Sequence, residues 1–459
     1  MRLLRACLLL TSLAAAALAQ AQSAPAKDDS SLTWNGITLY GIVDIGLQYT
    51  NHGAPVSDYF PGGTESVIQK NSNNSVTGFV GNNLSQSRIG LSGLEPIPNM
   101  DLSFVFRLET FFNPWSGNLS DGPKSLVLNN GKALADQATG VDSSVAGQLF
   151  GGAAYAGLSS SKFGTLTFGR NVTTLADGIS KYDPMAAAQA FSLLGFSGTT
   201  AGGGDTEDRR LDDSIKYVLK SGPVHVGAIY KLNGSTGGSN TAVQGQLGFD
   251  FLGGGSVDAF YAKTKDAIAA ASLSAAQVAQ LPALGYSVNN TLAATVSDNT
   301  AWALMALYNF GKPKVYAGYE HIKFANPDTP LPDGFIDIGG YQLAFVNNAA
   351  YDIEKTLKVI WAGGKYAVTD ELDVTLAWYG YRQDSFAAVS CSNASSSKCE
   401  GEVNVISALA DYRLSKRFDV YLGSMWSEAK NGLANGYLTI GPSGTASAVT
   451  TTAGLRFKF

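Results

Sequence analysis

Hydrophobic and polar residues alternate with a period of two along most of the chain. In residues 37–49, apolar positions such as Val43 and Ile45 alternate with polar ones such as Asp44. Such alternation predicts β-strands whose two faces meet different surroundings. Residues 100–112 repeat the pattern, with charged side chains on the polar face. Ionised groups are too costly to desolvate in a closed core, so the polar face is expected to meet water.

Sixteen segments show this alternation, and most are roughly 8 to 13 residues long, as tilted membrane strands are. Their connections alternate between short turns, such as residues 95–99 and 220–223, and loops that are mostly longer. Outer-membrane barrels have short turns on one rim and long loops on the other. The chain is therefore predicted to be all-β and to close into an antiparallel transmembrane barrel. The predicted strands start near residues 37, 87, 100, 149, 164, 210, 224, 242, 256, 300, 314, 354, 372, 401, 417 and 448.

A long stretch without strand pattern lies between two alternating segments, residues 165–170 and 210–219. Arg170, Arg209 and Arg210 lie at its two ends, and Arg209 is interpreted as a charge at the base of the loop. If the loop folds back into the lumen, it forms a charged constriction and the protein acts as a filter. The charged residues within the loop are Asp177, Lys181, Asp183, Asp205 and Glu207.

The N-terminus has the order of a secretory signal. Arg2 and Arg5 precede an apolar run, and small residues then offer cleavage near residue 21. We therefore expect a signal peptide at residues 1–21 and a mature chain of residues 22–459. The whole chain carries a net charge of −5, and without the two arginines 30 basic residues face 37 acidic ones, which gives −7. The acidic balance argues against nucleic acid as a partner.

Residues 267–296 contain no charged residue, and they are interpreted as a long Ala-rich loop with at most one or two helical turns. Pro282 and Gly285 within this stretch argue against a membrane helix. The three histidines lie far apart in the sequence, and phosphate-loop and nucleophile-elbow motifs are absent. Neither a metal, a cofactor nor an enzymatic activity is therefore expected. Cys391 and Cys399 are expected to form a loop disulfide in an exported chain, with two free thiols as the alternative.

Seven segments of the chain share their order with one protein family. They resemble the Gram-negative general diffusion porin family, especially porins of beta-proteobacteria, over essentially the whole mature chain. The resemblance implies a 16-stranded barrel that assembles as a homotrimer in the outer membrane. It also implies that the third long loop folds inward, opposite arginines on the barrel wall. The segments are ITLYGIVDIGL, SRIGLSGLE, AYAGLSSSKFGTLTFGR, SIKYVLKSG, KVYAGYEHI, DYRLSKRFDVYLG and GLRFKF.

The resemblance also applies to particular positions. Arg88, Arg170 and Arg210 fall where wall arginines are found, and the lumen-facing position of Arg107 adds a fourth. Two departures concern the acidic residues. The basic residue that some relatives carry early in the first strand is absent, since Ile42 and Asp44 occupy that region, and the loop lacks the Pro-Glu-Phe-Gly-Gly run of enterobacterial members. The loop, residues 171–209, would contribute Asp177, Asp183, Asp205 and Glu207 to the pore constriction.

Aromatic residues near predicted strand ends are expected to form girdles at the membrane interfaces. The second long loop, residues 113–148, is the expected contact with a neighbouring subunit. The aromatic residues concerned are Tyr49, Phe112, Tyr308, Trp361, Trp378, Tyr412 and Phe459.

The predicted function is passive diffusion of small hydrophilic solutes and ions through a water-filled channel. The channel would lie in contact with outer-membrane lipid and lipopolysaccharide. A barrel tuned to one substrate class, such as anions, organic acids or short peptides, is the alternative. A barrel enzyme is a third class, and it would need a catalytic partner beside His225 or His321. Ion preference follows the few charges at the narrowest point, so the net charge leaves it open.

Overall fold

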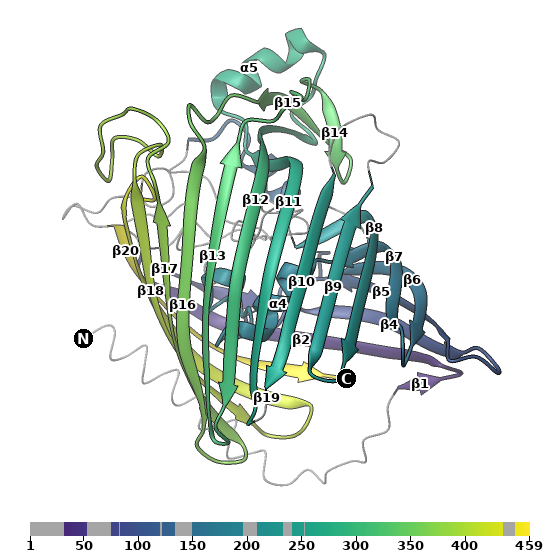
Figure 1. Cartoon of the computed structure of the whole chain (residues 1–459). Helices are drawn as coiled ribbons and strands as arrows, with labels where there is room; N and C mark the ends of the chain where they lie inside the picture. Colours follow the sequence, from purple (N-terminus) through teal and green to yellow (C-terminus); the bar gives the residue numbers. More distant parts are fainter. Residues whose placement is uncertain are drawn as a thin grey trace.

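The computed structural model describes residues 32–52, 75–81, 83–119, 122–133, 149–195, 209–232, 241–251, 253–434 and 446–459. Within these residues, twenty strands form one hydrogen-bonded sheet (Figure 1). The sheet closes because its last strand, β20, pairs antiparallel with β2. The amide of the terminal Phe459 donates to the carbonyl of Gly41 at 3.1 Å, which seals one end of this seam. The predicted signal peptide lies outside the described residues.

Sixteen of the strands make up the barrel wall, each antiparallel to its neighbours, which confirms the predicted architecture. Most strands start within a few residues of the predicted positions. The wall consists of β2 (Ile37–Thr50), β4 (Arg88–Pro96), β5 (Ser103–Phe111), β6 (Ala153–Ser160), β7 (Gly164–Val172), β8 (Arg210–Ser221), β9 (Val224–Lys231), β10 (Ala242–Phe251), β11 (Gly255–Ala271), β12 (Thr291–Asn309), β13 (Pro313–Ala325), β16 (Lys355–Ala367), β17 (Leu372–Gln383), β18 (Gly401–Arg413), β19 (Phe418–Asn431) and β20 (Ala446–Lys458).

The remaining described elements lie outside the regular wall. β1 (Thr33–Trp34) pairs with the start of β2, and β3 (Val76–Gly81) pairs with the other end of β2. β14 (Phe335–Ile338) and β15 (Tyr341–Asn347) form a hairpin beside β12. The helices are α3 (Gly122–Leu128), α4 (Thr174–Tyr182), the short η3 (Leu193–Gly195) and α5 (Ala275–Leu284). None of the helices in the described part of the chain is long and apolar enough to cross a membrane.

The interpretation of residues 267–296 as a loop is wrong at both ends. β11 continues to Ala271 and β12 starts at Thr291, so that a tall hairpin rises above the wall and carries α5 at its tip (Figure 1). The hairpin forms because Ile268 and Leu292 are buried in one cluster with Leu126 of α3. Tertiary burial thus gives strand structure to a stretch whose small residues show little alternation.

The described part of the second long loop packs within its own chain. Leu126 packs against the β11–β12 hairpin, and Asn130 bonds to the same hairpin. The side chain of Asn130 accepts from the amide of Leu273 at 2.8 Å and donates to the carbonyl of Thr291 at 2.7 Å. The helix α3 therefore lies against the β11–β12 hairpin. Contact of this loop with a neighbouring subunit stays a prediction for the residues that the structure does not describe.

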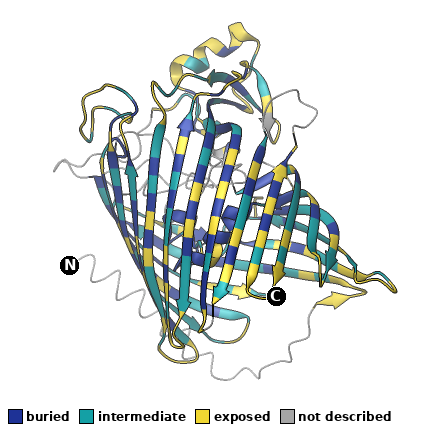
Figure 2. Ribbon diagram, in the orientation of Figure 1, coloured by how far each residue is buried: buried dark blue, intermediate teal, exposed yellow. Residues whose placement is uncertain are grey.

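The wall shows the expected alternation, with exposed residues next to buried ones along each strand (Figure 2). Leu304, Leu376 and Ile406 are exposed large apolar side chains on the outside. On the inner side of β11–β19, however, many inward residues are apolar and are buried in one cluster with the loop that contains α4, beside buried polar residues such as Asn299 and Glu320. The lumen is therefore divided into a half filled mainly by this apolar cluster, which we call the apolar half, and a polar half along β4–β9.

Trp361 illustrates this division. The expectation that it belongs to an interface girdle is wrong, because only 1% of the residue is exposed and its ring faces the lumen. Its indole N–H donates to the carbonyl of Tyr182 in α4 at 3.1 Å. Trp378, by contrast, is exposed.

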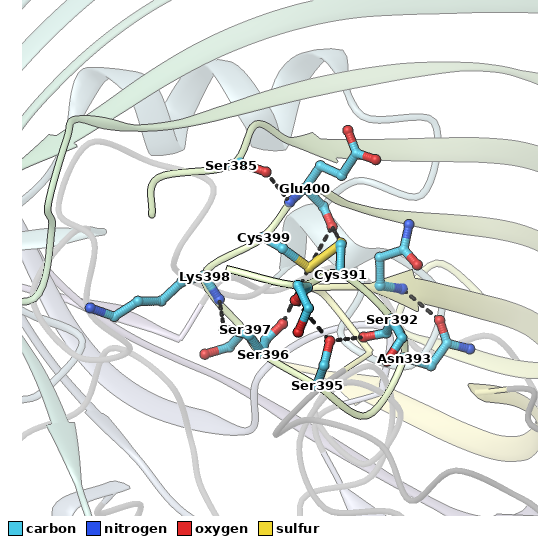
Figure 3. Close-up of a disulfide and its surroundings, with 12 residues drawn as sticks. Ser385, Cys391, Ser392, Asn393, Ser395, Ser396, Ser397, Lys398, Cys399 and Glu400 are labelled. Carbon is cyan, nitrogen blue, oxygen red and sulfur yellow. Dashed lines mark hydrogen bonds between the residues drawn. A yellow bond between two sulfur atoms is a disulfide. The ribbon is translucent and has the colours of Figure 1, made fainter. Parts of the chain in front are cut away.

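Cys391 and Cys399 are bonded to each other in the loop between β17 and β18 (Figure 3). The two residues are 8 positions apart in sequence. Closing so short a ring removes chain entropy from the unfolded loop, which contributes about 2 to 3 kcal/mol in the loop-entropy account. The bond orders a loop on the rim opposite the short turns.

Candidate functional site

Three arginines on neighbouring parts of the wall surround one carboxylate. Glu109 of β5 is buried, and it accepts from Arg107 Nη2 at 2.5 Å and lies 3.5 Å from Arg88 Nη1. The hydroxyl of Tyr40 accepts from Arg107 Nε at 2.6 Å and donates to Glu109 at 3.0 Å. Alternation places these groups on the inner face, as predicted for Arg107. One carboxylate thus holds two guanidinium groups in fixed positions.

Arg210 completes the basic wall at the start of β8. Its guanidinium lies 4.7 Å from the centre of the Phe111 ring, and that of Arg88 lies 5.9 Å from the same centre. Its Nε donates to the carbonyl of Gly152 at 2.9 Å. Stacking on an aromatic face and a backbone bond keep the long side chain in one orientation.

The loop after β7 supplies the opposite side of the site. Thr173 caps α4 by accepting from the amide of Ala176 at 3.2 Å, which fixes where the helix begins. Asp177 in the first turn then faces β8, where its carboxylate accepts from Lys216 Nζ at 2.5 Å. A carboxylate at a helix N-terminus is also favoured by the helix dipole.

These groups line one cavity of about 460 Å³ between the wall and the loop. Among the described residues, five cationic and two anionic side chains line it. Both anionic groups are engaged by lining cations, because Glu109 is paired with Arg88 and Arg107 while Asp177 is paired with Lys216. The described lining of the cavity therefore carries a net positive charge. The charged lining consists of Arg88, Arg107, Arg209, Arg210, Lys216, Glu109 and Asp177.

Two residues predicted for the constriction lie elsewhere. Arg170 is absent from the cavity lining, since its Nη1 lies 2.6 Å from Asp212 and its Nε donates to the carbonyl of Gly151 at 3.0 Å. The ladder between β7 and β8 is irregular between Gly169 and Asn171, which takes Arg170 out of the alternation.

Asp183 is also misplaced by the sequence interpretation. The residue is only 1% exposed and accepts from the hydroxyl of Tyr379 at 2.6 Å and from the amides of Met185 and Ala187 at 3.1 and 2.8 Å. Burial raises the pKa of the Asp183 carboxyl. This acid anchors the loop to the apolar half of the lumen. Asp205 and Glu207 lie outside the described residues.

The loop is held against the wall by close packing as well. A Cβ at Gly363 of β16 would lie 2.5 Å from the ring of Pro184, and one at Gly423 of β19 would lie 2.5 Å from the ring of Phe191. Only a residue without a side chain lets the loop approach so closely. At the far end of α4, Lys181 Nζ donates to Asp258 of β11 at 3.0 Å.

Three charged cavity residues were not among the predicted constriction residues: Glu109, Arg209 and Lys216. Lys216 lies in SIKYVLK, where its position alternates with the apolar Ile215 and Tyr217, and this alternation could have found it. Arg209 lines the cavity instead of serving only as a charge at the loop base, and its Nη1 donates to the carbonyl of Leu194 at 3.1 Å. No local pattern distinguished Arg209 from its neighbours.

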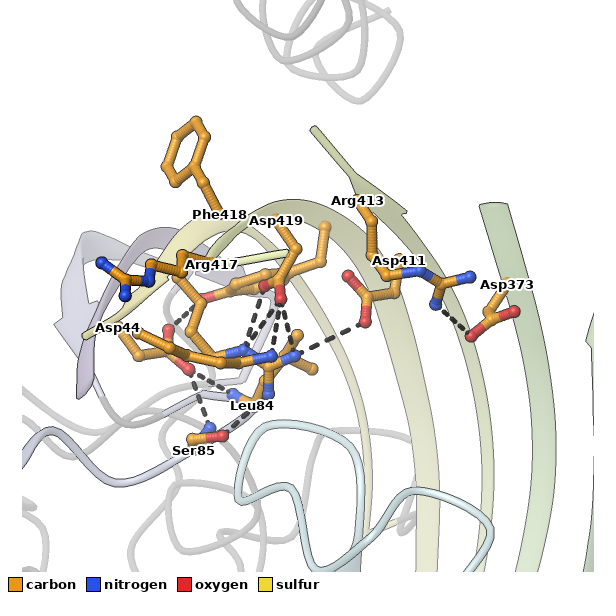
Figure 4. Close-up of polar contacts among 12 residues, drawn as sticks. Asp44, Leu84, Ser85, Asp373, Asp411, Arg413, Arg417, Phe418 and Asp419 are labelled. Atoms are coloured by element: carbon orange, nitrogen blue, oxygen red, sulfur yellow. Dashed lines mark hydrogen bonds and ion pairs between the residues drawn. The ribbon is translucent and has the colours of Figure 1, made fainter. Parts of the chain in front are cut away.

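A second charged cluster lies toward the end of the lumen where the short turns are (Figure 4). Asp419 accepts from Arg456 Nε at 3.0 Å and from Lys458 Nζ at 3.0 Å. Asp373 accepts from Arg413 Nη1 at 2.6 Å. Acids and bases alternate within this cluster, so it adds less net charge than the arginine wall does.

Asp44 lies beside this cluster, but its hydrogen bonds hold neighbouring segments of the chain together. It is fully buried and accepts from the amides of Leu84 and Ser85 at 2.7 and 2.8 Å and from the hydroxyl of Tyr421 at 2.5 Å. Asp44 thus fixes the segment before β4 to the wall.

Among the described residues, no group of three or more His, Cys, Asp or Glu side chains is placed to hold a metal ion. A closed barrel with an apolar outside, a charged cavity inside and a loop folded into its lumen defines an aqueous channel across a membrane.

Comparison with known proteins gives the family. The Gram-negative porin family matches residues 6–432. An outer membrane porin protein of Bordetella pertussis is 30% identical over 211 residues, which are 46% of this chain and 44% of that protein, so the match spans less than half of the relative. The chain belongs to the Gram-negative porin family, whose place is the outer membrane.

Solved structures agree with this fold. The anion-selective porin from Comamonas acidovorans is 20% identical, with a TM-score of 0.60 over 92% of this chain and 99% of that one. OmpT, an outer membrane protein of Vibrio cholerae, is 12% identical, with a TM-score of 0.55 over 94% of this chain and 100% of that one. At these identities the likeness concerns the fold alone.

Proposed function

We propose that the protein is an outer-membrane channel for passive diffusion of small hydrophilic solutes and ions, with a preference for anions. The preference rests on the imbalance of five cationic against two anionic side chains in the described cavity. Charged groups that line the narrow part of a pore decide which ions enter it, because the walls exclude bulk water that would screen them. The anion-selective porin from Comamonas acidovorans shares the fold that carries this cavity.

The constriction proposed here consists of the basic wall and the inward loop. Arg88, Arg107 and Arg210 attract anions on one side, and Asp177 on α4 holds Lys216 on the other. The rest of the loop contributes to the constriction by filling the apolar half of the lumen. Permeating solutes are thereby confined to the polar half along β4–β9.

A channel role without catalysis is part of the proposal. His225 lies between two carboxylates, at 2.8 Å from Asp258 and 3.0 Å from Asp250. His321 stacks on Trp302 with ring centres 5.8 Å apart. Both ring nitrogens of His225 are engaged by carboxylates, and among the described residues neither ring is hydrogen-bonded to a hydroxyl or thiol that it could activate.

We further propose that the protein is a homotrimer. One structure of OmpT from Vibrio cholerae that shares the fold is described as a trimer form. The outer faces of β2, β4 and β5 expose apolar side chains such as Leu39, Leu91 and Phe104, which suits either a subunit contact or lipid.

The reversal potential in a potassium chloride gradient tests the proposed preference. Purified full-length protein in a planar bilayer should give the sign expected for a channel that passes chloride more readily than potassium. A reversal potential of the opposite sign would refute anion preference. Block of the current by one particular solute at low concentration would instead favour the substrate-specific alternative.

A further inference from the structure

A second cavity, of about 450 Å³, lies next to the first on the side of the short turns. Thr165 of β7 and Val218 of β8 line both cavities, so the two meet at these strands. Lys216 lines the first cavity, and Lys220, next to the turn between β8 and β9, lines the second. Because residues four positions apart in a strand share a face, the two lysines follow each other along the lumen, about 13 Å apart.

All charged side chains that line the second cavity are basic. Among the described residues they are Lys181 at the end of α4, Lys220 of β8 and His225 of β9, and no acid joins them in this lining. The side chains of Lys181 and Lys220 are 39% and 65% exposed. Lumen water therefore reaches both ammonium groups, one from the inward loop and one from the barrel wall.

Asp258 of β11 lies behind these cations and is saturated by donors. It accepts from Lys181 Nζ at 3.0 Å, from Gln246 Nε2 at 3.0 Å and from the hydroxyl of Tyr182. With His225 Nδ1 at 2.8 Å, four groups contact the two oxygens of a fully buried side chain. A carboxylate accepts about four hydrogen bonds, so Asp258 offers no open acceptor to the cavity.

His225 links this acid to Asp250 of β10, which lies 3.0 Å from its Nε2. An ionised carboxylate only accepts hydrogen bonds, so both ring nitrogens donate and the ring carries a positive charge. Asp250 also accepts from Lys220 Nζ at 2.6 Å and from Ser256 Oγ at 2.7 Å. Three cations thus surround two engaged acids, and the surroundings of the second cavity are positive.

The two lysines keep donors for a further acceptor. Lys181 Nζ donates to Asp258 and, at 2.9 Å, to Ser256 Oγ, whereas Lys220 Nζ donates to Asp250. An ammonium group has three N–H donors, so among the described residues Lys181 keeps one and Lys220 keeps two. Donors that approach from the loop and from the wall suit an oxyanion with several acceptor oxygens.

We propose that the second cavity binds small oxyanions of the phosphate class. The oxyanion accepts from Lys181 and Lys220, and the charge of His225 adds to the attraction. This inference rests on the proposed function as a channel for anions, and it adds a second binding site to the route along β8. An anion that leaves Lys216 meets Lys220 next, and adjacent weak sites let a channel hold an ion and still release it.

The test is block of the chloride current by inorganic phosphate in planar bilayers, with phosphate added to one side at a time. Lys181→Gln and Lys220→Gln together should raise the half-blocking phosphate concentration on the more sensitive side by about five- to thirtyfold, because two charges near the bound anion are lost. Lys181→Arg with Lys220→Arg should retain the block. The matched control is Lys312→Gln with Lys416→Gln, which removes two exposed charges from other short turns.

Lys220→Gln alone covers the case in which the double variant displaces the loop, because Lys181 then keeps its contact with Asp258. It should raise the half-blocking concentration by about two- to fivefold. Equal block of the lysine variants and the control would overturn the proposal. Equal block of the unaltered channel from both sides would also overturn it, since the second cavity lies on one side of the constriction.

The sign of the reversal potential in the same recordings separates this inference from the proposed function. A channel that passes potassium more readily, yet keeps a block that depends on the two lysines, contradicts the anion preference and leaves the site in place. A channel that passes chloride more readily and is insensitive to phosphate overturns the site alone.

Discussion

Replacing Arg88, Arg107 and Arg210 together by Gln should turn the channel toward cations. The change reduces the described cationic lining of the cavity from five groups to two, which then balance two carboxylates. Each charge removed from a narrow lumen changes the free energy of a passing ion by about 0.5 to 1 kcal/mol. The chloride-to-potassium permeability ratio, measured from reversal potentials, should therefore fall by about ten- to a hundredfold.

Arg170→Gln is the matched control for this substitution. It removes one positive charge from the same part of the chain, but the guanidinium of Arg170 is bound to Asp212 and to the carbonyl of Gly151 and does not line the cavity. Its permeability ratio should equal that of the unaltered protein. If the triple variant and the control have the same ratio, the arginine wall does not set selectivity.

Replacing Asp183 by Ala should release the loop from the wall. The change leaves the hydroxyl of Tyr379 and the amides of Met185 and Ala187 without their acceptor. An unsatisfied buried donor costs about 1 to 3 kcal/mol, so docking of the loop should be strongly weakened. Single-channel recordings should show a larger and noisier conductance, because the filled half of the lumen opens.

Asp183→Asn serves as the control because it removes the charge and keeps an acceptor. Burial raises the pKa of Asp183, so the docked loop favours the neutral carboxyl. The stability of docking is then greatest below the ordinary pKa of Asp and decreases as the pH rises through the raised pKa. The Asn variant should lack this pH dependence and keep the original conductance. An Ala variant with the conductance of the unaltered protein would show that Asp183 does not anchor the loop.

Alternation was a reliable guide wherever one face of a strand meets lipid and the other meets water. It predicted Arg107 on the inner face and placed most strand starts within a few residues. It was less informative for β11 and β12, whose upper parts are buried by α3 and by the β14–β15 hairpin. Because both faces of these upper parts contact protein, neither face needs polar residues. Small residues occupy both faces, so the sequence shows no alternation there.

The roles of single residues depended on contacts that sequence does not show. Asp183 and Asp177 look alike as acids in one loop, but one packs under the loop against Tyr379 and the other faces Lys216. Trp361 lies in a strand like Trp378, yet a loop distant in sequence covers it. The apolar half of the lumen was unexpected because the water-filled barrel predicted from alternation leaves no place for such a core.

The most direct test of a water-filled channel is the conductance of the purified full-length protein in a planar bilayer. Because ions cross through water, insertion should produce current steps of uniform size, and the conductance should rise in proportion to the potassium chloride concentration. Membranes that stay silent after the protein has inserted would contradict the account.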